Sequence, residues 1–151
     1  MNNKTLILGV GNPILGDDGV GIHAVRKLKK EIDCADFEEA PVSGLELVEL
    51  FQNYEKVIIV DAVKTRDGAP GKIYELKQED IPTLHGASPH DVDFATALEY
   101  GKRFVGKMPE IKIYGIEAGN ITDFGESLTP PVEKSLHIVM EKIKNQLKDG
   151  S

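Results

Sequence analysis

The sequence predicts an α/β protein in which a mixed, mostly parallel β-sheet lies between two layers of helices. Two short apolar runs, KTLILG at residues 4–9 and KVIIV at residues 56–60, are typical of strands that helices cover on both faces. Segments with helical spacing of apolar residues alternate with strand-like segments, and this alternation favours parallel strands. The length of 151 residues fits a single domain, residues 1–151.

The first half of the chain predicts a strand, a loop, a helix and a weaker strand in that order. The strand at residues 4–9 leads into a loop at residues 12–18. The helix is predicted because apolar residues then recur three or four positions apart: Val20, Ala24, Val25, Leu28 and Ile32. A weaker strand is expected at residues 37–40, and the short helix after it carries Leu45, Val48 and Phe51.

The central strand is expected at residues 56–60 and to end at Asp61. A Gly-Ala-Pro-Gly turn signal at residues 68–71 then leads into KIYEL, residues 72–76, which we expect to be an antiparallel edge strand. The segment Ser88-Pro89-His90-Asp91 has the capping-box pattern that opens a helix, with Ser88 as the N-cap.

The chain is expected to close with a strand and a long helix. The strand is EIKIYGI, residues 110–116, and the helix begins with Thr129 as its cap and Pro130 as its first residue. Its buried face is predicted to consist of Val132, Leu136, Val139, Met140, Ile143 and Leu147.

Composition argues against several classes of function. The formal net charge of −7 gives an acidic surface, which repels nucleic acids and anionic membranes. The single cysteine, Cys34, cannot form an intramolecular disulfide. The first apolar run is too short and too interrupted by glycine for a signal peptide or a membrane span, so the expected location is the cytoplasm. No predicted helix has a surplus apolar face, so a monomer is expected.

Polar side chains with metal-binding chemistry follow the predicted strands. Asp17 and Asp18 lie in the loop after the first strand, Asp61 ends the central strand, and His90 lies in the first turn of a later helix. Ligands of open parallel sheets bind beyond the carboxyl ends of the strands, so these side chains are expected to converge on one crevice. Carboxylates and a neutral imidazole suit a divalent ion such as Zn²⁺, Ni²⁺ or Mn²⁺, and three protein ligands leave coordination positions open.

Each of these residues also has an ordinary structural explanation. An aspartate after a strand often caps the next loop, and an acidic pair before a helix often serves as cap and dipole compensation. A single histidine in a first helical turn is often solvated. Spacing alone therefore leaves the metal site and these structural roles as alternatives.

Other motifs of catalysis and cofactor binding are missing from the sequence. Ile14 stands where a dinucleotide-binding fingerprint needs its third glycine, and no G-x-S-x-G nucleophile elbow exists. Cys34 lacks a nearby histidine or asparagine partner. His23 and His137 are expected to be ordinary helix residues, with His23 at the surface. The usual covalent nucleophiles are therefore not predicted.

The same residues resemble a known family. The segment LGVGNPILGDDGVG, residues 8–21, resembles the strand-loop-helix signature of the hydrogenase maturation proteases. Four further blocks agree in order: SGLEL at residues 43–47, VIIVDA at 57–62, SPHD at 88–91, and GIE at 115–117 with LTP at 128–130. The resemblance extends over nearly the whole chain.

This resemblance implies a three-layer α/β/α fold with a mixed, mostly parallel five-stranded sheet. It implies an endopeptidase that removes the C-terminal extension of a [NiFe]-hydrogenase large-subunit precursor after nickel insertion. The family's nickel contacts fall on Asp18, Asp61 and His90, and Asp17 is a second acid that could share the task of Asp18. Two carboxylates and a histidine form an incomplete ligand set, which could complete the coordination of nickel held by the substrate.

Two roles follow from the resemblance as hypotheses. Nickel would polarise the scissile carbonyl or an attacking water, with Asp18 as the candidate base. Glu117, a further acid at the end of a strand, either orients the peptide or caps a loop.

Two alternatives compete with this prediction. A receiver-like signalling module would use Asp17, Asp18 and Asp61 to hold Mg²⁺, although the last strand ends in Glu117-Ala118-Gly119 where a receiver needs a lysine. A nickel-binding maturation chaperone without catalytic activity would associate with the precursor and leave its mass unchanged.

Overall fold

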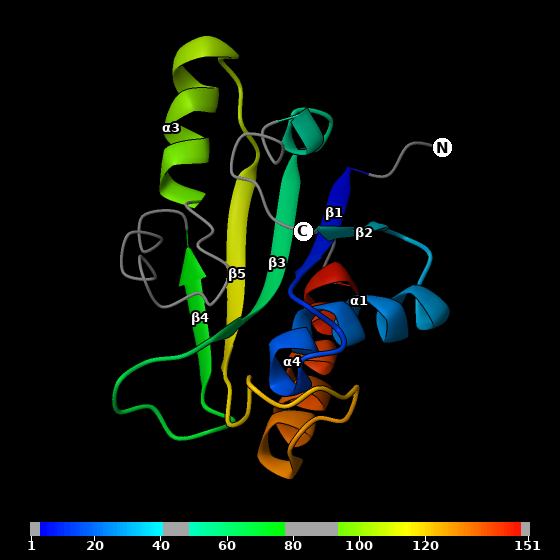
Figure 1. Ribbon diagram of the computed structural model, residues 1–151. Helices are drawn as coiled ribbons and strands as arrows, with labels where there is room; N and C mark the ends of the chain where they lie inside the picture. Colours follow the sequence, from blue (N-terminus) through cyan, green and yellow to red (C-terminus); the bar gives the residue numbers. More distant parts are fainter. Residues whose placement is uncertain (1–3, 41–48, 78–93, 149–151) are drawn as a thin grey trace.

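A five-stranded sheet forms the centre of the molecule in a computed structural model that describes residues 4–40, 49–77 and 94–148 (Figure 1). The strand order is β2-β1-β3-β5-β4, and β4 alone among these strands runs antiparallel to its neighbour. The strands are β1 (Thr5–Val10), β2 (Asp36–Ala40), β3 (Lys56–Val63), β4 (Ile73–Lys77) and β5 (Glu110–Glu117). The prediction of a mixed, mostly parallel five-stranded sheet with an antiparallel edge strand is confirmed.

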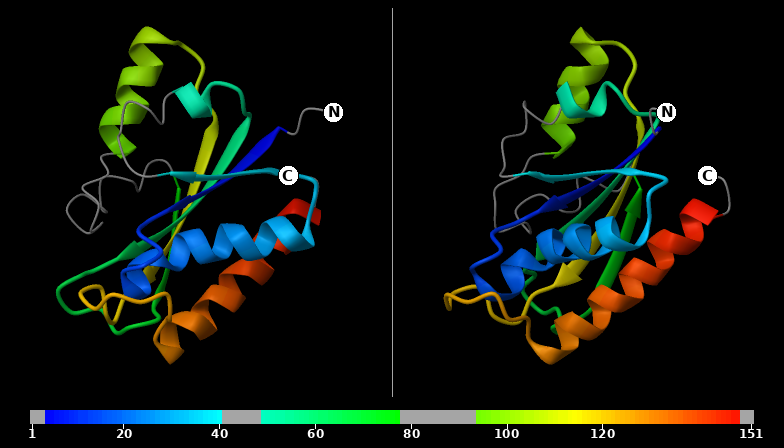
Figure 2. Two further views of the ribbon diagram at one scale, coloured as in Figure 1. Left: turned by 45° about the vertical axis from the view of Figure 1, so that its right-hand side comes forward. Right: turned by 90° about the vertical axis from the view of Figure 1, so that its right-hand side faces the viewer.

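Helices cover both faces of the sheet, so the predicted three layers are present. Helices α1 (Val20–Glu31) and α4 (Pro130–Lys148) lie side by side on one face, and α3 (Phe94–Phe104) lies on the other (Figure 2). A 3₁₀ helix, η1 (Gly16–Gly19), precedes α1 directly. The helices predicted from Leu45 and Val48 and from residues 88–91 begin outside the described residues.

Alternation along the strands divides the core into two halves. Ile58, Val60 and Ala62 of β3 face α1 and α4, whereas Val57, Ile59 and Val63 face the opposite half of the core. The predicted apolar face of α4 is buried, with Leu147 only partly so. Because neighbouring residues of β3 are buried on both faces, the strand reads as an uninterrupted apolar run.

Two glycines allow α1 to approach the sheet closely, because a side chain at either position would collide with the backbone. A Cβ added to Gly21 would collide with the backbone oxygens of Val60 and Val10. A Cβ added to Gly9 would collide with the backbone of Gly21 and with Val25. The glycines of the first signature segment therefore place the beginning of α1 against the carboxyl ends of β1 and β3.

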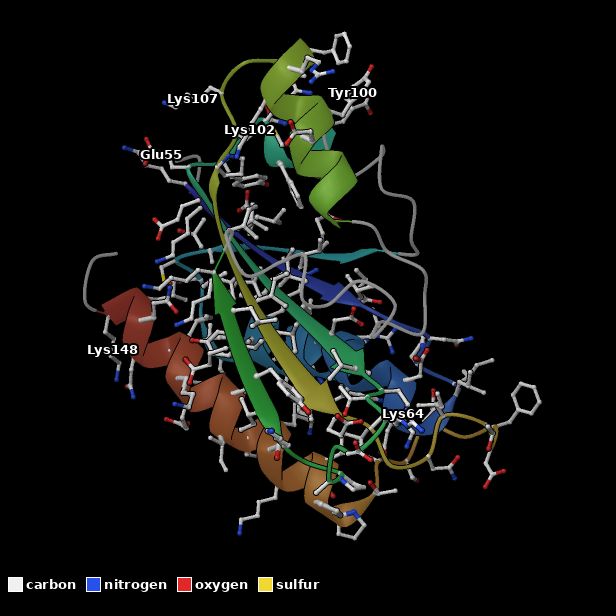
Figure 3. The ribbon with its side chains drawn as sticks, turned by 90° about the vertical axis from the view of Figure 1, so that its left-hand side faces the viewer. Glu55, Lys64, Tyr100, Lys102, Lys107 and Lys148 are labelled. Carbon is white, nitrogen blue, oxygen red and sulfur yellow. The ribbon has the colours of Figure 1, made fainter. Side chains whose placement is uncertain are left out.

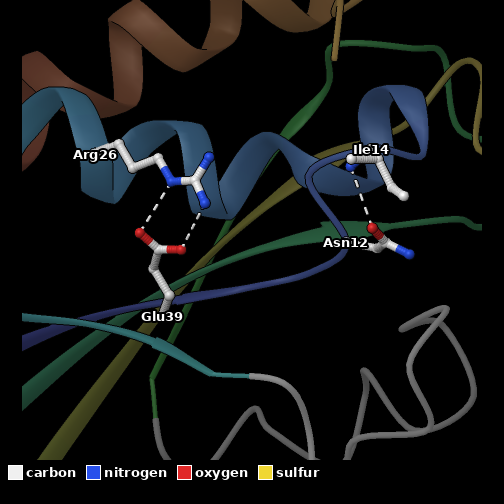
Figure 4. A network of polar contacts seen from close by, with 4 residues as sticks. All are labelled: Asn12, Ile14, Arg26 and Glu39. Atoms are coloured by element: carbon white, nitrogen blue, oxygen red, sulfur yellow. Dashed lines mark hydrogen bonds and ion pairs between the residues drawn. The ribbon is translucent and has the colours of Figure 1, made fainter. Parts of the chain in front are cut away.

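A bidentate ion pair joins α1 to the edge strand β2. Arg26 donates two hydrogen bonds to the carboxylate of Glu39, at 3.0 and 2.9 Å (Figure 4). The hydrogen bond from Arg26 lowers the pKa of Glu39 below its ordinary value. Both side chains are largely exposed, so the pair orients the edge strand more than it stabilises the fold.

The structure corrects one detail of the prediction. Asp61 does not end the central strand, because β3 continues to Val63 through its pairing with β5, whereas its pairing with β1 stops at Val60. Thr129 directly precedes α4 and its carbonyl accepts the hydrogen bond of the Glu133 amide, as expected of an N-cap residue, while its hydroxyl donates a hydrogen bond to Asp17. The start of α4 at Pro130 is as predicted.

The sheet topology also argues against the receiver-like alternative. The flavodoxin-like receiver sheet has the order 2-1-3-4-5. Here β5 lies between β3 and β4, and β4 is antiparallel. Within the described residues, no helix has the length and apolar character needed to cross a membrane.

Candidate active site

Three segments meet beyond the carboxyl ends of β1, β3 and β5: the η1 segment, residues 64–72 and residues 118–129 (Figure 1). Lys64 ties the second segment to the third, because its Nζ donates to the carbonyls of Ala118 and Gly119 at 3.0 and 3.3 Å. Figure 3 shows Lys64 at this end of the sheet, with α3 and Tyr100 at the opposite end. The edge where topology predicts a ligand site is therefore built from loops that bond to one another.

Asp18 lies in η1 and is almost fully buried, with 2% of its surface exposed. Its Oδ2 accepts a hydrogen bond from the backbone amide of Asn12 at 3.1 Å. Asn12 comes two residues after the end of β1, so the carboxylate reaches back over the carboxyl end of that strand. Burying a carboxylate costs free energy of desolvation, so buried carboxylates are found more often where their charge serves a function.

Asp61 is fully buried in β3, the strand next to β1. It alternates with Val60 and Ala62 and so lies on the sheet face of Ile59 and Val63, away from α1 and α4. Its partner in β5 is Gly115, which has no side chain. Because η1 contacts β3, two of the three predicted site residues, Asp18 and Asp61, belong to neighbouring elements at the same edge of the sheet.

His90, the third predicted site residue, lies outside the described residues. Within the part of the chain that is described, no cluster of three or more His, Cys, Asp or Glu side chains has the geometry of a metal site. The assignment of Asp18, Asp61 and His90 as a joint ligand set therefore stays a prediction.

Asp17, proposed as a second acid for the same task, has a different position. Its carboxylate accepts hydrogen bonds from the backbone amides of Gly119, Asn120 and Thr129 at 2.8, 3.0 and 2.7 Å. The Thr129 hydroxyl donates a fourth bond at 2.7 Å. The side chain is fully buried. Asp17 thus fastens η1 to residues 119–129, and sequence spacing carried no signal for this role.

Glu117, at the end of β5, caps a loop. Its carboxylate accepts bonds from the backbone amide and the hydroxyl of Thr65, at 2.8 and 2.6 Å, and from the Tyr74 hydroxyl at 2.9 Å. Glu117 is fully buried and lies on the same face as Asp61, two residues beyond Gly115. Of the two roles expected for Glu117, the loop-capping role is the one that its contacts explain.

The remaining candidate nucleophiles and bases lie elsewhere. Cys34 is exposed, between α1 and the start of β2, at the amino edge of the sheet. His137 is exposed on α4. His23 is half-buried and not a surface residue as predicted; burial lowers its pKa, with Arg26 contributing in the same direction. His23 follows the buried Val20 by three residues and precedes the exposed Arg26 by three, so helical spacing places it at the margin of the buried face.

The fold and the edge define a three-layer α/β protein whose buried carboxylates gather at the carboxyl end of a mixed sheet. This chain belongs to the hydrogenase maturation protease family, whose model matches residues 22–146. The family defines the class of enzyme as an endopeptidase.

Individual relatives agree with this assignment. The chain is 30% identical to the hydrogenase 2 maturation protease of Escherichia coli K12, over 97% of this chain and 92% of that protein. The structure of the hydrogenase maturating endopeptidase HybD from E. coli is similar, with a TM-score of 0.83 and 28% identity over 98% of this chain and 94% of that one. The [NiFe] hydrogenase maturation protease HybD from Thermococcus kodakarensis shares the fold, with a TM-score of 0.76 and 24% identity over 95% and 98% of the two chains.

Proposed function

We propose that this protein removes the C-terminal extension of a [NiFe]-hydrogenase large-subunit precursor after nickel has been inserted. Family membership supports the reaction class, and one structural observation supports the site. Two buried aspartates, Asp18 and Asp61, lie on neighbouring elements at the carboxyl edge of the sheet. The nickel belongs to the substrate, so a resident metal is not part of the proposal.

In this proposal Asp18, Asp61 and His90 bind the nickel that the precursor already holds. Two carboxylates and an imidazole leave coordination positions for the substrate's own ligands, so precursor without nickel binds weakly. Nickel supplies Lewis-acid polarisation of the scissile carbonyl or of the attacking water. Asp18 accepts the proton of the water as it attacks the carbonyl carbon, and the proton then passes to the amide nitrogen that leaves.

Intact-mass measurement of the nickel-loaded precursor, before and after incubation with the protein, tests the reaction. The expected result is loss of mass equal to the C-terminal extension, and no loss from nickel-free precursor. Stable association with an unchanged mass would favour the chaperone alternative, which family membership disfavours.

Three substitutions test the site: Asp18→Asn, Asp61→Asn and His90→Ala. Each is expected to lower the processing rate by at least about 100-fold, because each removes a ligand or the base. His137→Ala, an exposed histidine on α4, is the matched control and should process at the wild-type rate. Wild-type rates in the first three variants would contradict the site assignment.

We also propose that the protein acts as a monomer in the cytoplasm. Size-exclusion chromatography with light scattering checks the first point, and fractionation of cells that express the protein checks the second.

A further inference from the structure

Two large apolar side chains are exposed at the same edge of the sheet as Asp18 and Asp61. Phe124 has 84% of its surface exposed and Ile14 has 50%. They lie on different segments, Ile14 in the loop after β1 and Phe124 in the segment between β5 and α4. Exposed apolar side chains are common singly, but two on adjoining segments beside a candidate site suggest a contact surface.

Backbone hydrogen bonds hold these two segments together. The Gly125 amide donates to the Ile14 carbonyl at 2.7 Å, and the Gly16 amide donates to the Gly125 carbonyl at 2.9 Å. Leu15 and Gly125 form a parallel β-bridge. The residues that follow Ile14 and Phe124 are therefore paired, which fixes the backbones that carry the two apolar side chains relative to each other.

The Phe124 segment is also fixed from its own side. Asn120 accepts hydrogen bonds through its Oδ1 from the amides of Thr122 and Asp123, at 3.0 and 3.2 Å. The amide of Asn120 donates to Asp17, and the amide of Asp17 donates to the Asn120 carbonyl at 2.8 Å. A surface held in one conformation loses little entropy when a partner binds it.

The same surface adjoins Asp18. The Ile14 amide donates to the side chain of Asn12 at 3.2 Å (Figure 4), and the Asn12 amide donates to Asp18. Ile14 therefore lies in the turn that positions the carboxylate of Asp18. The Ile14 and Phe124 surface is thus placed where it can contact a polypeptide bound at Asp18.

Charge restricts the partner further. The two residues nearest to Phe124 in the sequence that carry charge are Asp123 and Glu126, and both are exposed. Residues 118–129 contain no lysine or arginine, and the Lys64 side chain bonds to the opposite end of this segment, at Ala118 and Gly119. Glu126 lies beside His23 and Lys27 of α1, which partly offset its charge, so Asp123 supplies most of the negative charge beside Phe124. An apolar side chain flanked by lysine or arginine complements this surface in both shape and charge.

We propose that Ile14 and Phe124, with Asp123 and Glu126, form a docking surface for the large-subunit precursor, and that it binds an apolar residue flanked by basic residues. This inference rests on the proposed function, because it names the part of the same edge that holds the substrate. The surface binds the polypeptide of the precursor, whereas Asp18 and Asp61 contact its nickel and take part in the chemical step.

Steady-state processing of the nickel-loaded precursor by Phe124→Ala and Ile14→Ala tests this surface. Phe124→Ala should raise KM about tenfold and leave kcat within about twofold, since an exposed aromatic side chain that becomes buried on binding contributes its energy to substrate binding. Ile14→Ala should raise KM by a smaller factor. The matched control is Phe104→Ala on α3, because Phe104 is also largely exposed, at 68%, but lies at the opposite end of the molecule.

A pair of double variants tests whether the acidic residues Asp123 and Glu126 contribute to precursor binding. Asp123→Asn/Glu126→Gln should raise KM and weaken its dependence on salt concentration, whereas Glu99→Gln/Glu110→Gln makes the same change of charge far from the edge and should do neither. Circular dichroism confirms that all variants fold.

Direct binding of nickel-loaded precursor, measured by biolayer interferometry, separates the two proposals. Cleavage by the wild type with an unchanged KM and affinity in Phe124→Ala and Ile14→Ala overturns the docking surface alone. If the wild type neither binds nor cleaves the precursor, the proposed function and the docking surface are both wrong.

Discussion

At the scale of single residues, adjacent acids have separate tasks. Asp17 accepts four hydrogen bonds from residues 119–129, whereas Asp18 points to the end of β1 and accepts a bond from Asn12. The two side chains follow each other in η1, and the 3₁₀ turn directs them differently. The structural anchor thus stands directly beside the candidate catalytic residue.

Asp17→Asn should lower the free energy of unfolding by about 3 kcal/mol, because an amide replaces one acceptor oxygen with a donor that faces backbone amides. Urea denaturation measures this change. Asp123→Asn is the control, since Asp123 is exposed and its carboxylate accepts a hydrogen bond from the Asn120 side chain at the surface; its change should stay within about 0.5 kcal/mol. Equal stability of the two variants would contradict the anchoring role.

His23 makes stability depend on pH. Burial and Arg26 lower its pKa in the folded state, so the folded protein resists a proton that the unfolded chain accepts near pH 6.5. As the pH falls from about 7.5 to about 5.5, this difference lowers the free energy of unfolding. His23→Gln should therefore lose less stability than the wild type over this range in urea denaturation, while His137→Gln, exposed on α4, should behave like the wild type.

At the scale of elements, the contact between α1 and the sheet depends on glycine. Gly21 lies at the first turn of α1, where the helix meets the backbone oxygens of Val10 and Val60. The same approach brings η1 against β3 and thereby Asp18 to the strand that carries Asp61. The signature segment is therefore rich in glycine for a steric reason.

Gly21→Ala should destabilise the protein by about 2 kcal/mol, although alanine favours a helix by about 1 kcal/mol. The added Cβ meets rigid backbone atoms. Gly101→Ala on α3 is the matched control, because its Cβ meets the flexible side chain of Met108, which can rotate away. A smaller loss in Gly21→Ala than in Gly101→Ala, measured by thermal or urea unfolding, would count against this account.

At the scale of the whole molecule, the fold separates the thiol from the site. Cys34 lies at the amino edge of the sheet, where β2 begins, and Asp18 and Asp61 lie toward the carboxyl edge. Treatment with iodoacetamide should alkylate the exposed Cys34 and leave precursor processing unchanged, as should Cys34→Ser. If iodoacetamide inhibits precursor processing by the wild type but not by Cys34→Ser, the thiol lies close enough to the site to affect processing.

Much of this architecture is predictable from local patterns. Apolar runs located the strands, the spacing of Val20 to Leu28 located α1, and Pro130 located the start of α4, since periodicity and proline geometry are properties of short segments. The position of Asp18 and Asp61 at the same edge of the sheet was predictable because topology directs the carboxyl ends of parallel strands to one edge.

The sequence by itself determined the family, the layers and the position of Asp18 and Asp61 at one edge of the sheet, because these depend on patterns within single elements and on shared motifs. Only the tertiary structure decided that Asp17 is an anchor, that Glu117 caps a loop, and that Ile14 and Phe124 share one surface. These contacts join residues about 50 to 110 positions apart, and no local pattern encodes which distant partner a carboxylate or an exposed side chain will meet.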